Sequence, residues 1–163
     1  MSWWSKIIEL VIPSTKSSDF DRALKFLGPI EGGYVNDPTD RGGETKYGIS
    51  KRSYPHLDIK SITKEQMAAI YKRDFWDKMG CDTMQWPINL IVFDSAVNHG
   101  PLTAQALLKR TPKTSDLRTY CHNFLNERID LYKRLIIKRP SQIKFKNGWF
   151  NRVEALRAVV REL

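Results

Sequence analysis

Glu31-Gly-Gly-Tyr-Val-Asn-Asp-Pro-Thr-Asp-Arg-Gly-Gly-Glu-Thr-Lys-Tyr-Gly-Ile-Ser50 is the stretch around which the rest of the chain is organised. Five of its twenty residues are glycine, and it also carries four carboxylates, Glu31, Asp37, Asp40 and Glu44. A glycine-rich loop without other notable residues is usually a linker, whereas one that concentrates acids and aromatic residues is typical of a loop shaped for chemistry. This segment is therefore the first candidate for a functional site.

The residues before this segment predict a helix whose apolar face leads up to Glu31. Ser18 is suited to the N-cap, and Asp19 and Asp21 follow in the first turn, where the helix dipole favours negative charge. The apolar positions share one helical face: Phe20, Ala23, Leu24, Leu27 and Ile30. On a continued helix Glu31 would project from that face, where partial desolvation raises the pKa of a carboxyl group. A general acid needs such an environment near neutral pH.

Two features bear on this interpretation in opposite directions. Gly28-Pro29 predicts that the helix ends or kinks there, because Pro lacks a donor and disfavours helical geometry at the residue before it. A lone Glu at a helix end is also more often a structural acid at the edge of a core. Asp40 and Thr45 change that balance, since a turn precedes Asp40 and Thr45 opens an alternating Thr-Lys-Tyr-Gly-Ile-Ser strand. Two carboxylates that flank one cleft are what glycosidic bond cleavage uses.

The same segment resembles the signature of glycoside hydrolase family 108, the N-acetylmuramidases found as phage endolysins and bacterial cell-wall enzymes. The resemblance rests first on Glu31-Gly-Gly-Tyr-Val-Asn-Asp-Pro and on Asp40-Arg-Gly-Gly-Glu-Thr-Lys-Tyr-Gly-Ile. It continues in three shorter motifs, Phe75-Trp76-Asp77, Cys81-Asp82 and Val92-Phe-Asp-Ser-Ala-Val-Asn98. It ends in Phe145-Lys-Asn-Gly-Trp-Phe-Asn-Arg152, which is similar to the C-terminal peptidoglycan-binding region of that family.

The resemblance implies a catalytic site built on Glu31. In that family the Glu of Glu-Gly-Gly-Tyr is the catalytic acid, a role that carries over to Glu31. The order Glu, Asp, Thr also resembles the catalytic constellation of other phage lysozymes, which extends the implied site to Asp40 and Thr45. Tyr34, Tyr47 and Trp76 are candidates for lining the sugar subsites; for Trp76 a place in the core is the alternative, and the commoner fate of a Trp.

A second part of the candidate site lies on a predicted helix that begins near Pro87 and is apolar almost all round. This pattern indicates the central buried helix of the fold. Asp94 and Asn98 lie one turn apart on it, and buried polar groups need partners. They either brace the active-site loop or contact substrate. Bracing is the favoured interpretation, and the resemblance alone places Asn98 near the cleft.

Four further helices are predicted from caps and periodicity. Thr63 and Gln66 form a capping box before a helix that Gly80 ends, and a short helix covers residues 102–110. The longest helix runs from a cap at Ser115 to about Arg139, and a last helix covers residues 149–163. The expected fold is mainly α (α+β): a lysozyme-like helical domain with a small β-hairpin beside the catalytic Glu.

The chain is expected to form one compact domain with an uneven distribution of charge. Its 163 residues suit a single core. We divide it into an N-terminal amphipathic segment (1–17), a catalytic region (18–98) and a basic helical region (99–163) packed into the same domain. Residues 1–98 balance 13 Lys and Arg against 13 Asp and Glu, whereas residues 99–163 have 14 against 5. This excess favours an anionic envelope surface as a partner, with a merely solvated helix face as the alternative.

Other partners and cofactors find no support in the sequence. No nucleic-acid-binding motif accompanies the basic region. The two cysteines, Cys81 and Cys121, follow no metal or redox spacing, and the three histidines, His56, His99 and His122, are widely separated. We expect no metal and no cofactor. Both cysteines are interpreted as free thiols, although sequence alone leaves a disulfide between them open.

The resulting functional hypothesis is a monomeric peptidoglycan hydrolase that cleaves the β-1,4 bond between N-acetylmuramic acid and N-acetylglucosamine in host cell lysis. The first twelve residues lack a basic n-region and a cleavage site, so we expect the enzyme in the host cytoplasm until its release to the cell wall. Two alternatives remain at this point. One is a lytic transglycosylase that uses Glu31 alone, and the other is a non-catalytic cell-wall-binding protein.

Overall fold

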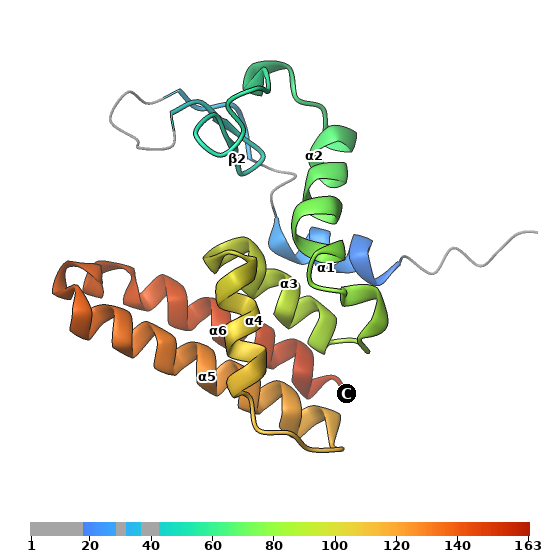
Figure 1. The fold of residues 1–163 in the computed structure, drawn as a ribbon, viewed down its shortest axis with the longest axis vertical. Helices are drawn as coiled ribbons and strands as arrows, with labels where there is room; N and C mark the ends of the chain where they lie inside the picture. The colour runs from blue at the N-terminus through green and yellow to red at the C-terminus, as the bar shows by residue number, and fades with distance from the viewer. Residues whose placement is uncertain (1–17, 29–31, 37–42) are drawn as a thin grey trace, which may run out of the picture.

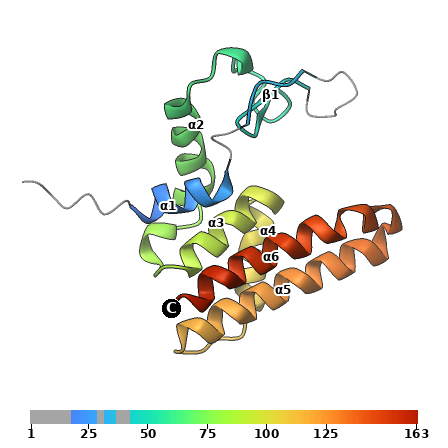
Figure 2. The ribbon, with the colours of Figure 1, turned by 180° about the vertical axis from the view of Figure 1, so that it is seen from behind.

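A computed structural model describes residues 18–28, 32–36 and 43–163. In these residues the chain is mainly helical, with six α-helices and one small antiparallel sheet (Figures 1 and 2). The predicted lysozyme-like α+β fold class is confirmed. No helix of the described part is long and apolar enough to cross a membrane.

Helix α1 (Asp19–Leu27) begins as the sequence predicts and ends before it reaches Glu31. The Ser18 hydroxyl accepts a hydrogen bond from the Asp21 amide at 3.1 Å, and Ala23 and Leu24 are buried. Gly28 then adopts a left-handed conformation with φ of 72° and terminates the helix. The expectation that Glu31 extends the apolar face of a continued helix is therefore wrong, because the helical spacing stops at Leu27.

The predicted β-hairpin is confirmed, but its turn lies within residues 45–50, for which the sequence predicted one alternating strand. Strands β1 (Thr45–Lys46) and β2 (Ile49–Ser50) pair in an antiparallel manner, and Tyr47 and Gly48 form the turn with φ of 51° and 76°. Two positive φ values in succession are typical of the tight turn that reverses a two-residue hairpin. Val35 also pairs with Thr45 through two backbone hydrogen bonds of 2.8 Å. The hairpin is thereby tied to the chain on both sides of residues 36–44.

The next part of the chain crosses from the hairpin to the core in short helical pieces. These are η4 (Ile59–Ser61), α2 (Lys64–Tyr71), a π-helical turn η5 (Lys72–Asp77) and η6 (Cys81–Thr83). The predicted capping box is confirmed, with hydrogen bonds of 2.9 and 3.2 Å between Thr63 and Gln66. The regular α-helix ends at Tyr71, earlier than predicted, and Gly80, with φ of 66°, precedes η6.

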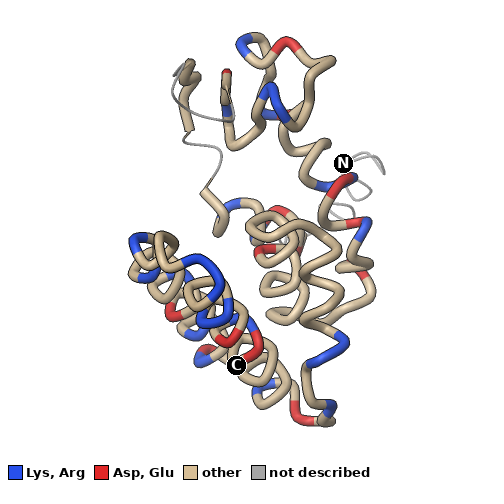
Figure 3. Tube along the Cα trace, turned by 60° about the vertical axis from the view of Figure 1, so that its left-hand side comes forward, with Lys and Arg blue, Asp and Glu red and all other residues tan. Residues whose placement is uncertain are grey.

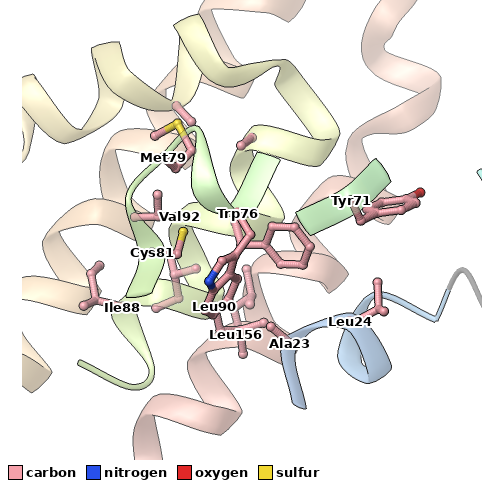
Figure 4. Close-up of a cluster of buried hydrophobic side chains, with 14 of the residues drawn as sticks. Ala23, Leu24, Tyr71, Trp76, Met79, Cys81, Ile88, Leu90, Val92 and Leu156 are labelled. Atoms are coloured by element: carbon pink, nitrogen blue, oxygen red, sulfur yellow. The ribbon is translucent and has the colours of Figure 1, made fainter. Parts of the chain in front are cut away.

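Helix α3 (Ile88–His99) is the central helix, as its all-apolar pattern predicted, and residues 88–96 are buried. Phe93 lies on it within 5.3 Å of the Trp76 ring and 5.9 Å of the Phe20 ring, measured between ring centroids. Figure 4 shows the surrounding cluster, to which α1, α3 and α6 contribute Ala23, Leu90 and Leu156. Helix α4 (Pro101–Arg110) follows directly after Gly100.

The C-terminal part is a long antiparallel helix pair, α5 (Leu117–Lys138) and α6 (Lys146–Arg161), joined by η7 (Pro140–Phe145). Asp116, and not Ser115 as predicted, caps α5 by accepting a hydrogen bond from the Thr119 amide at 2.8 Å. Helix α6 begins three residues before the predicted Trp149. The buried apolar residues of both helices belong to the same core cluster as those of α1 and α3.

Gly48 is a position where the hairpin and α2 leave no room for a side chain. A Cβ atom at Gly48 would collide with the Tyr71 hydroxyl, which also donates a hydrogen bond to the Tyr47 carbonyl at 3.3 Å. We predict that Gly48→Ala lowers the free energy of unfolding by about 2–3 kcal/mol, because collision and positive φ act together. Chemical denaturation measures the change.

Gly43 provides the matched control. It has a φ of 66°, but nothing lies within 4 Å of the place that a Cβ atom would occupy, so only backbone strain applies. Gly43→Ala should cost about 1 kcal/mol. Equal losses in the two variants would contradict a close approach between Gly48 and Tyr71.

Candidate active site

A cleft of about 440 Å³ lies between the hairpin and the C-terminal helix pair. Leu27 and Gly28 at the end of α1 and Gly48 in the hairpin turn contribute to its lining. The opposite lining comes from α3, α5 and α6: Asn98, Arg128, Tyr132, Trp149 and Arg152. In Figures 1 and 2 the hairpin stands over the α5–α6 pair in both views. The cleft thus joins segments that are more than 100 residues apart in the sequence.

A buried charge network holds the helical side of the cleft together. Asp94 on α3 is fully buried, and its Oδ2 accepts from Arg128 Nη1 of α5 at 2.5 Å. Its Oδ1 accepts from Arg152 Nε of α6 at 2.7 Å. Arg128 is fully buried too and also donates to Ser95 Oγ at 3.1 Å. Every charge that the fold buries here has an opposite charge or a hydrogen bond, as burial requires.

The same network orients an aromatic pair in the cleft lining. Arg128 Nε donates to the Tyr132 hydroxyl at 2.7 Å. The Tyr132 ring stacks on Trp149, with ring centroids 4.7 Å apart and planes inclined by 12°. Because Arg128 is held by Asp94, the position of the stacked rings depends on α3, α5 and α6 together.

His99 completes this corner at the end of α3. Its Nε2 lies 3.0 Å from the Tyr132 hydroxyl. Burial, and after it the positive charge of Arg128, lower the pKa of His99 to about 4 against the opposing effect of Asp94. The imidazole is therefore neutral at neutral pH.

Comparison with known proteins identifies the family of the region that supplies the hairpin side of this cleft. Residues 24–100 match the family described as Glycosyl hydrolase 108. This region belongs to the glycosyl hydrolase 108 family. This match supports the predicted glycoside hydrolase class. No curated protein matches the chain.

The fold similarity extends beyond the family region. The structure of Brucella abortus SagA is similar to this chain with a TM-score of 0.71 and 22% sequence identity. The similarity covers 88% of this chain and 94% of SagA, so it includes much of the α5–α6 pair as well as the glycosyl hydrolase 108 region. It supports the lysozyme-like fold over most of the chain.

The structure places the predicted catalytic residues only in part. Glu31 and Asp40 lie outside the described residues. Thr45 begins β1, is half-buried, and donates a hydrogen bond from Oγ1 to the Gly43 carbonyl at 3.2 Å. It lies three residues before Gly48, which lines the cleft.

Two of the predicted sugar-lining aromatics belong to the hairpin region and are outside the cleft lining. The Tyr34 hydroxyl donates to Glu44 Oε1 at 2.9 Å, and this hydrogen bond raises the pKa of the exposed Tyr34. Tyr47 is half-buried in the turn and packs against the core, with Lys46 Nζ 5.2 Å from its ring centroid. Their contacts with substrate stay a prediction.

Trp76 requires a correction. Its side chain is fully buried between Phe20 and Phe93, and its indole Nε1 donates to Asp82 Oδ1 at 2.7 Å. The ring therefore has no face available for a sugar, and the core alternative is the one that the structure shows. Asp82 explains how so large a ring is buried without an unpaired N–H.

The sequence left two roles open for Asp94 and Asn98, which were to brace the active-site loop or to contact substrate. The structure places the two side chains in different surroundings. Asn98 is exposed, lines the cleft, and donates from Nδ2 to the Asp94 backbone carbonyl at 2.7 Å. Its position is compatible with the predicted substrate contact. Asp94 braces the site, because its carboxylate is used up by Arg128 and Arg152.

Arg128 and Tyr132 are parts of the site that the sequence did not predict. A signal was present, since Arg128 lies four residues after the buried Phe124 and four before the buried Tyr132, on the apolar face of α5. Such a cation needs a buried anion, and Asp94 was the acid on the most apolar helix. Trp149 and Arg152 lie in the C-terminal motif Phe145–Arg152, from which no role was predicted for either residue.

No group of three or more acidic, His or Cys side chains in the described part of the chain could hold a metal ion. Cys81 and Cys121 are buried free thiols. Burial raises the pKa of the Cys81 thiol to about 12 and that of Cys121 to about 11, so neither is a reactive thiolate at neutral pH.

Removing the anion from the network should destabilise the fold strongly. We predict that Asp94→Asn lowers the free energy of unfolding by about 3–5 kcal/mol, because it leaves two arginines without their buried counter-ion. The control is Asp130→Asn, which removes an exposed pair with Lys133 and should cost at most about 1 kcal/mol. Similar costs in urea denaturation would show that the buried network is not a principal support.

The lowered pKa of His99 predicts a specific pH dependence. Between pH 6.5 and about 4 the unfolded state binds a proton at His99 that the native state does not, so native stability falls as the pH falls through this window. Thermal unfolding of the wild type and His99→Gln should show a shallower slope for the variant. His56→Gln removes an exposed histidine instead and should keep the wild-type slope; an unchanged slope in His99→Gln would contradict the prediction.

Proposed function

We propose that this chain is a muramidase, which cleaves the β-1,4 bond between N-acetylmuramic acid and N-acetylglucosamine of peptidoglycan, with Glu31 as the general acid. Membership of the glycosyl hydrolase 108 family supports a peptidoglycan hydrolase in general. The narrower bond specificity rests on the Glu-Gly-Gly-Tyr motif and on the cleft beside it. Host cell lysis is the biological role that we propose for this activity.

The observation that carries the proposal is that Gly28, just before the motif, and Gly48, within it, line the same cleft. Gly28 lines the cleft, and Glu31 follows it by three residues. Three residues of extended chain span at most about 11 Å, and this short separation in the sequence supports Glu31 as the general acid of the cleft.

The segment that contains Asp40 lies between two residues that the structure describes, Val35 and Thr45. The hydrogen-bonded pair Val35 and Thr45 closes the segment that contains Asp40. Thr45 itself is three residues from Gly48 in the cleft lining. This short separation of Thr45 from the cleft lining supports the assignment of Asp40 as the second catalytic group.

In the proposed mechanism each of the three residues has a distinct task. Glu31, in its protonated form, donates its proton to the glycosidic oxygen as the bond breaks. Asp40 stabilises the oxocarbenium-like centre or positions the attacking water. The Thr45 hydroxyl already donates to the Gly43 carbonyl, so its oxygen is left to accept a hydrogen bond from that water.

The helical side of the cleft supports a polymeric, acidic sugar substrate. Trp149 is half-buried and stacks on the buried Tyr132, and sugar rings have apolar faces that pack on such an aromatic ring. Arg128 and Arg152 share one carboxylate, which leaves a net positive charge for the carboxylates of muramic acid and its peptides. Neither feature is needed to hold a neutral small molecule.

The test is mass spectrometry of the fragments that wild type and Glu31→Gln release from purified peptidoglycan. Loss of the general acid should reduce release by about 10²–10⁴-fold, because that is the usual contribution of such a group. Wild type should yield disaccharide-peptides with a reducing muramic acid end. Glu162→Gln, a change of the same kind at the exposed C-terminus, should release fragments at the wild-type rate.

Three outcomes would contradict the proposal. Undiminished release by Glu31→Gln would move the chemistry away from this residue. Anhydro-muramic ends, with full activity retained in Asp40→Asn, would indicate a lytic transglycosylase that uses Glu31 alone. Binding to peptidoglycan with no release by either protein would indicate a non-catalytic wall-binding protein.

A further inference from the structure

The end of the α5–α6 pair carries exposed apolar side chains that the proposed catalysis does not use. We define this tip as residues 133–147. Ile137 is 80% exposed, Ile143 53% and Phe145 45%, and these are three of the seven exposed large hydrophobic residues among the described residues. Ile137 and Ile143 also line a hollow of about 330 Å³, together with Lys133, Ile136, Lys146 and Phe150. Apolar surface gathered in this way marks a contact with another molecule.

Positive charge surrounds the apolar side chains of the tip. Between Asp130 and Glu154 the chain contains seven Lys and Arg and no Asp or Glu. Arg152 turns inward to Asp94, and the others lie on or beside the tip: Lys133, Arg134, Lys138, Arg139, Lys144 and Lys146. Figure 3 shows Lys and Arg recurring along this helix pair.

The cationic and apolar groups of the tip are interleaved. Lys144 Nζ lies 5.0 Å from the ring centroid of Phe145, and Lys146 Nζ lies 5.8 Å from that of Phe150. A surface of this kind suits the interface of a bilayer, where aliphatic and aromatic side chains enter the acyl boundary and ammonium groups meet lipid phosphates.

We propose that the tip is a docking surface for an anionic phospholipid bilayer. A polar wall polymer would satisfy the lysines and arginines but would leave Ile137 and Ile143 exposed to water. A second copy would bring two tips of six basic residues together, each with Asp130 beside Lys133 as its acidic neighbour, and like charges repel. Negatively charged lipid complements both the charge and the apolar side chains.

This docking surface is separate from the cleft but shares α6 with it. Lys146 lines the hollow of the tip, and Trp149 lines the cleft. A chain held by its tip keeps the cleft beside the membrane, where the adjacent cell wall is its substrate. The lipid interaction itself does not depend on the proposed hydrolase activity.

Flotation of the full-length chain with vesicles tests the proposal. The probes are phosphatidylcholine vesicles with and without phosphatidylglycerol, at low and at physiological salt. We expect binding only to the vesicles that contain phosphatidylglycerol, and weaker binding at the higher salt concentration because exposed charges are screened.

Two pairs of variants separate the contributions of charge and of apolar contact. Lys144→Gln with Lys146→Gln should weaken binding by about 25-fold, since each basic residue near an anionic surface contributes about fivefold. Lys64→Gln with Lys78→Gln removes the same charge from exposed positions elsewhere and should have little effect. Ile137→Ser with Ile143→Ser should weaken binding at least about tenfold, whereas Leu102→Ser, at an 81% exposed position on α4, should not.

All four variants alter exposed side chains, and thermal melts check that they fold. Wild-type lipid binding by the Ile137→Ser and Ile143→Ser variant would overturn the proposal in favour of a purely ionic contact, such as one with a wall polymer. Absence of vesicle binding, together with self-association that the same variant abolishes in sedimentation equilibrium, would overturn it in favour of a second copy. Equal loss in the tip and control charge variants would reduce the effect to net charge and would also overturn it.

Discussion

The structure depends on one buried carboxylate, Asp94, that receives two arginines from different helices. Arg128 comes from α5 and Arg152 from α6, so a single residue on the central helix fixes both C-terminal helices against it. An ion pair in the interior is costly to desolvate, and it stabilises little compared with apolar packing of the same volume. What it provides is an exacting geometry, because each charge tolerates few arrangements that leave it paired.

The shape of the helical side of the cleft follows from this arrangement. Arg128 uses one nitrogen for Asp94 and another for the Tyr132 hydroxyl, and Tyr132 supports the stacked Trp149. His99 meets the same hydroxyl and is neutral, because burial and Arg128 both oppose its protonation. The aromatic residues of the cleft are therefore positioned by the polar side chains of Asp94, Arg128 and His99. These polar side chains are themselves shielded from water by the surrounding core.

The hairpin side of the cleft is held by backbone geometry instead of charge. Gly48 has to lack a side chain because the Tyr71 hydroxyl occupies that space, and Tyr71 binds the Tyr47 carbonyl in return. The helical side of the cleft is thus held by a buried ion network, and the hairpin side is held by a tight turn. The basic tip of α5–α6 needs neither, and its exposed side chains are free to serve a contact outside the cleft.

The sequence by itself determined the features that depend on neighbours a few residues apart. These include the Ser18 cap, the Thr63–Gln66 capping box, the buried α3 helix, and the recognition of the Glu31 motif, since caps, periodicity and motifs are local patterns. Local patterns gave a wrong prediction where two neighbouring residues could each cap a helix. At the start of α5, Ser115 was the predicted cap and Asp116 is the actual one. Only the tertiary structure decided that Trp76 is buried, that Arg128 completes the site, and that Gly28 and Gly48 meet Trp149 across one cleft. Those outcomes depend on contacts between distant segments, and a side chain's spacing along the chain does not reveal which distant partner will exclude water from it.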